Sequence, residues 1–262
     1  MIRLKEMMNN NSYLNRLNPI TKIILMVIPT LLVSFAYDVY TPTAFFTFIF
    51  LFSSLLGKIN LFVLIKKIYK FIMIGVSFGL FVIVTRLLSK DVINIDIILT
   101  SISLCMRIMV FSLLSVVFVI TTDPNEFSLS LIHQAKLSYK VVYPFLIAYR
   151  FVPTFQDELN KIIIAKEIRG INSEGGIIKN ILNFPGYILP LLTSAIRKGE
   201  RVSIAMESRA FGAFSDRTYY KKTTVNKADY IAIAFMIIIS ILIIWVGINY
   251  GFIAFKKGLV VN

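Results

Sequence analysis

Residues 229–255 read DYIAIAFMIIISILIIWVGINYGFIAF, and no charged side chain follows Asp229 in this stretch. A helix needs about 20 apolar residues to cross the roughly 30 Å hydrocarbon core of a bilayer, so this run is long enough to span a membrane. The whole chain of 262 residues is also apolar, with 57% hydrophobic residues and a mean hydropathy of +0.77. Four more apolar runs predict helices at about 20–36, 41–56, 69–88 and 97–120. The sequence therefore predicts an all-α polytopic membrane protein with about five transmembrane helices.

The apolar runs divide the chain into three parts. Residues 1–120 contain an N-terminal segment and four predicted spans, residues 121–228 are too polar to span, and residues 229–262 hold the final span and a tail. The first two spans are short, and Pro42 suits the first turn of the second, so we expect a tight helical hairpin there. The first twenty residues lack the short apolar core and cleavage site of a signal peptide, so we expect the N-terminus to be kept.

Lysine and arginine are unevenly distributed between the predicted loops. Residues 1–22 hold four of them, residues 57–70 another four and residues 121–228 fifteen. The opposite side of the predicted topology has four, namely Arg86, Lys90, Lys256 and Lys257. Because basic loops stay in the cytoplasm, we expect the N-terminus and residues 121–228 to be cytoplasmic and the protein to lie in the cell membrane. The net charge of +14 then reflects topology, and nucleic-acid binding is not expected because no nucleotide-stacking motif accompanies the basic residues.

Residues 121–228 predict a helical cytoplasmic domain. The stretch TTDPNEF at 121–127 combines capping residues with a proline suited to a first helical turn, which predicts a helix reaching about Tyr139. A long helix from Val141 to Gly170 follows, with apolar residues spaced by three and four at positions 145, 149, 152, 155, 159, 162 and 163.

A second long helix is predicted after a break. A loop at 171–176 and a short helix lead to the break at 183–186, and the further helix runs to about Phe211. Its apolar and small residues at 188, 191, 195, 199, 202 and 206 form one stripe. Two long amphipathic helices in a polar region need a partner surface, in the membrane interface or beneath it.

The two long helices end in similar sequences, AKEIRG at 165–170 and AMESRA at 205–210. In both, Ala-x-Glu-x-Arg precedes a small residue; alanine and arginine at i and i+4 share a helical face, and the guanidinium fork suits a carboxylate or carbonyl groups in a partner's groove. We therefore predict two similar partner-binding sites, formed by Ala165, Glu167, Ile168, Arg169 and Gly170, and by Ala205, Glu207, Ser208, Arg209 and Ala210. The alternative is an ordinary helix end, since a basic residue followed by glycine also stabilises a helix terminus.

The sequence offers little for catalysis or metal binding. His133 is the single histidine and Cys105 the single cysteine, and both are expected to serve packing. No G-x-x-x-x-G-K-[ST] loop for binding nucleotide phosphates occurs, so we expect a non-catalytic chain without cofactor or metal. Arg107 falls near the middle of the fourth span, where it either faces a partner within the bundle or extends toward an interface.

These motifs resemble the transmembrane T component of energy-coupling factor transporters, the vitamin and metal-ion importers driven by ABC-type ATPases. The resemblance covers nearly the whole chain: LNPITK at 17–22 is similar to the pre-span signature, TTDP at 121–124 to the membrane exit, and RFVP at 150–153 to the first coupling segment. Ile168-Arg169-Gly170 and Ser208-Arg209-Ala210 stand where the family has its X-Arg-X signatures. The segments Ala205-Met206-Glu207 and Phe211-Gly212 resemble the rest of the second signature. Ala210 departs from the family pattern, in which glycine is common.

The resemblance implies a scaffold whose coupling helices bind two ATPase subunits through Arg169 and Arg209, while the membrane part holds a substrate-binding S component. Closure of the ATPases would move the coupling helices, and the S component would reorient and release its substrate inward. Two other functions stay open from the residues alone: a permease that forms its own substrate path, and a membrane protein-assembly factor.

Overall fold

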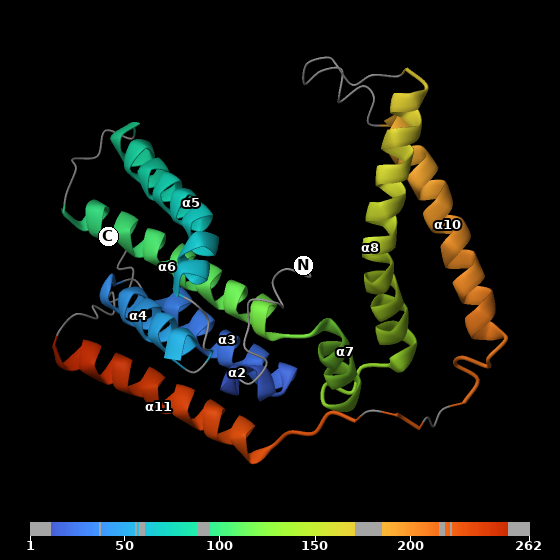
Figure 1. The fold of residues 1–262 in the computed structure, drawn as a ribbon. Coiled ribbons are helices and arrows are strands. Elements are labelled where there is room, and N and C mark those ends of the chain that lie inside the picture. The colour runs from blue at the N-terminus through green and yellow to red at the C-terminus, as the bar shows by residue number, and fades with distance from the viewer. Residues whose placement is uncertain are drawn as a thin grey trace, which may run out of the picture. The chain divides into compact units, whose positions relative to one another are not determined.

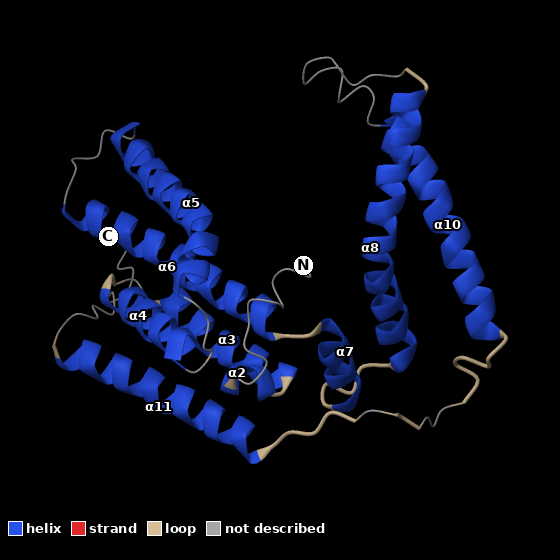
Figure 2. Ribbon diagram, viewed as in Figure 1, coloured by secondary structure: helices blue, strands red, loops and turns tan. Residues whose placement is uncertain are grey.

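The computed structural model describes residues 12–36, 38–55, 57, 61–88, 95–170, 185–214, 218–220 and 222–250. All regular secondary structure in these residues is helical (Figures 1 and 2), which confirms the all-α prediction. In chain order the helices are α2 (Tyr13–Arg16), α3 (Pro19–Phe35), α4 (Tyr40–Leu55), α5 (Leu61–Leu88), α6 (Ile95–Thr121), α7 (Pro124–His133), α8 (Tyr139–Ile168), α10 (Pro185–Glu207) and α11 (Lys227–Asn249).

All five predicted apolar segments form helices. Within the described residues, three contain stretches long and apolar enough to cross a membrane, Leu64–Leu88, Ile97–Thr121 and Lys227–Asn249. Helices α3 and α4 are apolar but shorter, with 17 and 16 residues, and extend about 26 and 24 Å. The protein is thus a multi-pass membrane protein in which a short helical pair accompanies three longer helices.

The chain divides into two compact units. Met1–Ser130 and Thr223–Asn262 form the first, here called the membrane unit, and Leu131–Lys222 form the second, here called the hairpin unit. Side chains from α3, α4, α5, α6 and α11 build the core of the membrane unit; its buried members are Val33, Phe45, Ile49, Leu64, Ile68, Val110, Leu113, Leu114 and Ile243.

Helix α6 packs against α3, α4 and α5 in the membrane unit, and both α3 and α5 run antiparallel to it. Gly75 and Gly79 of α5 are buried against Cys105 and Ser101 of α6, where an added Cβ atom would lie 3.2–3.3 Å from the neighbouring helix. Small residues allow such close approach between helices in a membrane.

Polar contacts set the register of α3 along α6. The Nζ atom of Lys22 donates a 2.5 Å hydrogen bond to the Thr121 carbonyl, and Arg107 donates to the Ala36 carbonyl. The two contacts are 14 residues apart on both helices, about 21 Å, so α3 lies along the C-terminal half of α6. Arg107 therefore faces into the bundle and holds the end of α3, which decides between the two orientations left open for it.

The predicted end of α7 is wrong: the helix ends at His133, well before Tyr139. Lys136 has a φ of 53°, in the left-handed region, and the Leu137 amide donates to the Leu131 carbonyl, so the backbone turns away from the helix here. Ser138 then starts α8, because its side chain accepts a hydrogen bond from the Lys140 amide.

In the hairpin unit, α8 and α10 lie side by side and antiparallel (Figure 1). Helix α8 continues through Pro153, and α10 begins at Pro185, a residue type favoured in a first turn. The loop predicted at 171–176, the short helix after it and the first part of the break at 183–186 lie outside the described residues. So does the predicted end of the last span, since α11 is described to Asn249.

Candidate functional site

The first arginine motif ends α8. The helix stops at Ile168, Arg169 is its C-cap, and Gly170 follows with a φ of +72°. The Gly170 amide donates a 3.0 Å hydrogen bond to the Glu167 carbonyl. Every predicted site residue of this copy is exposed, and Ile168 has 81% of its surface accessible.

The second motif ends α10 in the same way. The helix stops at Glu207, the Ala210 amide donates to the Glu207 carbonyl at 2.9 Å, and the Phe211 amide donates to the Met206 carbonyl at 3.0 Å. These two bonds and the φ of 55° at Ala210 define a Schellman motif. Arg209 is thus placed by this closing turn and not by the i, i+4 geometry of a regular helix.

Gly170 and Ala210 occupy equivalent positions, because both adopt the left-handed conformation directly after the arginine. The small residue of the motif therefore has a backbone role. Glycine enters this conformation freely, whereas alanine is strained in it. The left-handed backbone conformation accounts for glycine after Arg169, and alanine is a small residue that adopts it at some cost after Arg209.

The structure places the two motifs at opposite ends of the α8–α10 hairpin. Lys166 of α8 lies 4.1 Å from the ring centre of Tyr187 near the start of α10, whereas Tyr143 packs on Phe211 just after the end of α10. The 26 residues from Tyr143 to Arg169 extend about 39 Å along α8. The ten predicted site residues consequently form two separate sites.

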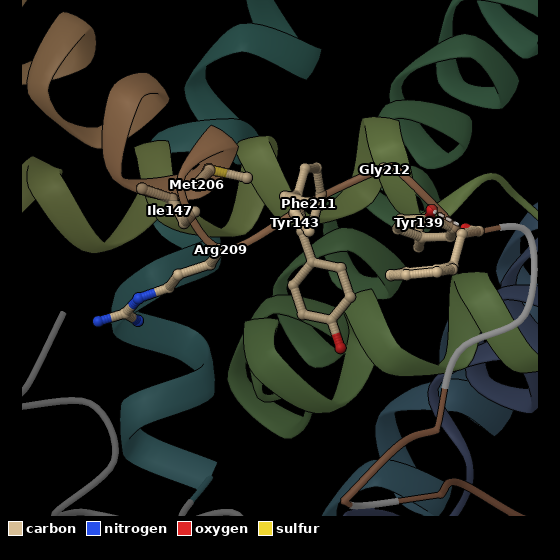
Figure 3. Close-up of a pocket in the computed structure, with 9 residues that line it drawn as sticks. Tyr139, Tyr143, Ile147, Met206, Arg209, Phe211 and Gly212 are labelled. Carbon is tan, nitrogen blue, oxygen red and sulfur yellow. Dashed lines mark hydrogen bonds between the residues drawn. The ribbon is translucent and has the colours of Figure 1, made fainter.

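A pocket of about 370 Å³ adjoins Arg209 (Figure 3). Its wall is largely aromatic and apolar and consists of Tyr139, Tyr143, Ile147, Met206, Arg209, Ala210, Phe211, Gly212 and Phe214. Figure 3 shows the guanidinium extending away from the aromatic rings.

The aromatic wall is fixed by its own contacts. The rings of Tyr139 and Tyr143 meet Phe211 edge-on at 5.6 and 6.3 Å, and the Tyr139 hydroxyl donates to the Phe214 carbonyl at 2.8 Å. The site prediction did not include these side chains; Phe211-Gly212 after the motif was the signal that pointed to part of this wall.

An ion pair joins α8 and α10 between the two sites. Glu158 of α8 accepts hydrogen bonds from Lys198 and Ser194 of α10. The hydrogen bonds from Lys198 and Ser194 hold the pKa of Glu158 below its ordinary value. These contacts fix the register of the hairpin and hence the separation of the two arginines.

The other candidate residues serve packing. The ring of His133 meets that of Tyr219 at 4.6 Å, and Cys105 faces Gly75 across the α5–α6 contact. Among the residues that the structure describes, no group of three His, Cys, Asp or Glu side chains is arranged to hold a metal ion.

Known proteins resemble this chain over most of its length. The CbiQ family, described as cobalt transport protein, matches residues 10–220. The "Energy-coupling factor transporter transmembrane protein EcfT" of Staphylococcus aureus is 28% identical over 248 residues, which cover 89% of this chain and 92% of the relative. The proteins of the same name from Streptococcus equi and Brevibacillus brevis are 26% and 25% identical and cover 88% and 93% of this chain, and 91% and 97% of their own length.

The match includes both X-Arg-X segments, the membrane exit at Thr121 and the apolar helices α3 to α6. These are the elements from which the sequence suggested a transporter scaffold. The chain belongs to the CbiQ family and is a transmembrane T component of an energy-coupling factor transporter.

Proposed function

We propose that this chain is the scaffold and energy-transducing subunit of its transporter. It couples ATP hydrolysis by two partner ATPase subunits to movement of a substrate-binding S component, and it catalyses no reaction itself. The observation that carries this proposal is the pair of equivalent, exposed arginine sites at the two ends of one helical hairpin. Two equivalent sites separated by most of the length of α8 suit two similar partners that move relative to each other.

Arg169 and Arg209 are the residues that would hold these partners. Each follows the last residue or turn of a helix, so its backbone is fixed while its side chain extends into solvent. An arginine desolvated in a partner's groove and paired with a carboxylate contributes about 2 kcal/mol or more, whereas an exposed helix cap contributes about 0.3–1 kcal/mol. The size of the effect on binding therefore distinguishes the two roles.

The first experiment is copurification of the ATPase subunits with wild-type, Arg169→Ala, Arg209→Ala and doubly substituted chains. Arg201→Ala is the matched control, because Arg201 is an exposed arginine in the interior of α10. We expect each single substitution to weaken association by about thirtyfold or more and the double substitution to abolish it, since 1.4 kcal/mol corresponds to a factor of ten. Equal ATPase recovery with all five chains, after membrane insertion is verified, would reduce the two arginines to helix caps.

The S component is proposed to bind the membrane unit. Its apolar helix α5 exposes large side chains along its length, including Phe62, Phe78 and Phe81. The transported substrate is proposed to be a vitamin or a metal ion, and the family description as cobalt transport protein supports the metal ion. Copurification of a small substrate-binding membrane protein with the chain tests this part. Binding of substrate by the isolated chain would favour a permease instead.

A further inference from the structure

The hairpin unit is joined to the membrane unit by two chain crossings, after Ser130 and before Thr223. The outgoing crossing follows the end of α6 at Thr121 and the start of α7, and the returning crossing leads into α11. These two connections link the hairpin unit covalently to the membrane helices, so movement of the hairpin unit can be transmitted along them. The residues that bond these connections to the membrane helices therefore decide how such movement is transmitted.

Lys22 holds the outgoing side. It lies in the first turn of α3, is only 6% exposed, and donates to the Thr121 carbonyl, the last residue of α6. Glu126 in the first turn of α7 and Asp229 in the first turn of α11 also act electrostatically on its ammonium group. A buried lysine is costly unless such partners offset its lost hydration.

Asn18 holds the returning side. It is the N-cap of α3, and its side-chain amide donates to the Thr224 carbonyl at 3.2 Å. Its backbone amide donates to Asp229 at 2.8 Å, and Asp229, which is 1% exposed, also accepts from the Asn226 amide at 2.7 Å. The Tyr13 hydroxyl adds a bond to the Ala228 carbonyl. The returning chain is thus tied to the start of α3 by several hydrogen bonds.

Asn18 and Lys22 are four residues apart, so both connections are fixed to one helical turn. Lys22 also lines a small cavity of about 50 Å³ whose wall is mostly apolar and includes Leu25, Phe118 and Met236. Charges are weakly screened in apolar surroundings, which strengthens the hydrogen bond and the electrostatic attractions of Lys22. Loss of one of these partners would therefore cost more free energy than at an exposed site. The sequence signature LNPITK at 17–22 contains both residues.

We propose that the first turn of α3 is a joint that transmits movement of the hairpin unit to the membrane unit, with Lys22 and Asn18 as its positioning residues. Lys22 couples the outgoing connection to α3, and Asn18 couples the returning one. Displacement of either connection then displaces α3 instead of bending the chain locally. This role goes beyond the binding of ATPases at Arg169 and Arg209, although it rests on ATP-driven movement of the hairpin unit.

The test compares wild-type, Lys22→Met, Lys22→Arg and Asn18→Ala chains, each in lipid nanodiscs with its copurified ATPase subunits. Lys66→Met is the matched control, because Lys66 is an exposed lysine of the membrane unit outside the joint. ATP hydrolysis is measured together with hydrogen–deuterium exchange of residues 19–35 in the presence and absence of ATP and vanadate. Exchange of α5 and α6 without nucleotide reports whether each variant is folded.

In the wild type and in the control, trapping with ATP and vanadate should change exchange in α3. Lys22→Met should keep ATP hydrolysis but reduce this ATP-dependent change about fivefold or more, the size of a modest coupling energy. Lys22→Arg should retain most of the ATP-dependent change in α3 exchange, since a guanidinium can also donate to the Thr121 carbonyl. Asn18→Ala should reduce the same change, because it removes the side-chain hydrogen bond to the returning connection.

Three results would overturn the proposal. One is an unaltered ATP-dependent change in both Lys22→Met and Asn18→Ala. A second is an equal loss of ATP hydrolysis and of the ATP-dependent exchange change in α3 in these variants, which would indicate a purely structural contact. The third is an α3 that does not respond to ATP in the wild type. Absence of ATPases from the wild-type preparation contradicts the proposed function itself and is seen before any variant is compared.

Discussion

Ala210 directly follows the second arginine, and the structure shows the consequence of an alanine at this position. It occupies the left-handed position of a Schellman motif with a φ of 55°, where Gly170 stands in the other copy. A Cβ atom costs about 1–2 kcal/mol in this conformation, part of which is offset because glycine loses more freedom on folding. The second arginine site is therefore held by a slightly strained turn.

Ala210→Gly should consequently stabilise the end of α10 by about 1 kcal/mol, and Gly170→Ala should destabilise the end of α8 by a similar amount. Hydrogen exchange measures this directly, since the Phe211 amide is bonded within the turn. We expect its exchange to slow about fivefold in Ala210→Gly. Faster exchange in this variant would show that the left-handed turn is not the conformation of the second motif.

Two cationic side chains of the membrane unit, Arg107 and Lys22, are stabilised by hydrogen bonds to carbonyl groups at helix ends. Arg107 donates to the carbonyl of Ala36, the C-cap of α3, and Lys22 donates to that of Thr121, the last residue of α6. The carbonyl groups at a helix C-terminus lack partners within the helix and carry the negative end of the helix dipole. Lys22 is buried and Arg107 partly buried, and the cost of removing each cation from water is offset by its hydrogen bond to a helix-end carbonyl.

At the scale of elements, the α5–α6 pair depends on two glycines. Both neighbours that an added Cβ atom would meet at Gly79 are backbone atoms of Ser101, and backbone cannot move aside as a side chain can. Gly79→Leu should force the helices apart at a cost of about 1–3 kcal/mol and lower the midpoint of thermal denaturation in detergent by about 5 °C.

A matched substitution provides the control for this prediction. Gly199 of α10 has no atom within 4 Å of the position of an added Cβ, so Gly199→Ala should be neutral or slightly stabilising. An unchanged midpoint in Gly79→Leu would mean that α5 and α6 are not in close contact.

The α8–α10 pair should be sensitive to acid through Glu158. The pKa of Glu158 in the folded hairpin lies below its ordinary value of 4.5 because Lys198 and Ser194 donate to the carboxylate. This contact therefore stabilises the hairpin fully above the ordinary pKa and is lost as pH falls below about 4.5 through the lowered value. Exchange of amides in α8 and α10 should accelerate over this range in the wild type. In Glu158→Gln that acceleration should be smaller, and an identical pH profile would exclude the ion pair as its cause.

At the scale of the whole molecule, the distribution of basic residues predicts the orientation in the membrane. Cys105 is the single cysteine, so Cys105→Ala provides a background for labelling with a membrane-impermeant maleimide. In this background Lys66→Cys and Lys161→Cys should react only from the cytoplasmic side, and Arg86→Cys only from the opposite side. Labelling of Arg86→Cys and Lys161→Cys from the same side would contradict the proposed topology.

The sequence alone determined the helical membrane architecture and the position of the arginine motifs along the chain. Apolar runs near the length of a bilayer core leave helices as the solution for satisfying the backbone, and this is a property of each segment by itself. The helix ends at Arg169 and Arg209 were likewise recognisable, since a small residue after a helix is a local signal. The end of α7 was predicted too far along the chain. The left-handed residue that follows the helix is Lys136 and not a glycine, so the sequence contains no local sign of the turn.

Only the tertiary structure decided what these segments do together. The antiparallel pairing of α8 and α10, fixed by contacts such as Glu158 with Lys198, sets the two arginine sites at opposite ends of one hairpin. The joint at the start of α3 unites Asn18 with Asp229, which are 211 residues apart in sequence. The sequence next to Asn18 does not indicate a contact with Asp229, and the sequence next to Asp229 does not indicate one with Asn18. Their contact arises because packing of the apolar helices brings distant polar groups to one buried place, where each must find a partner.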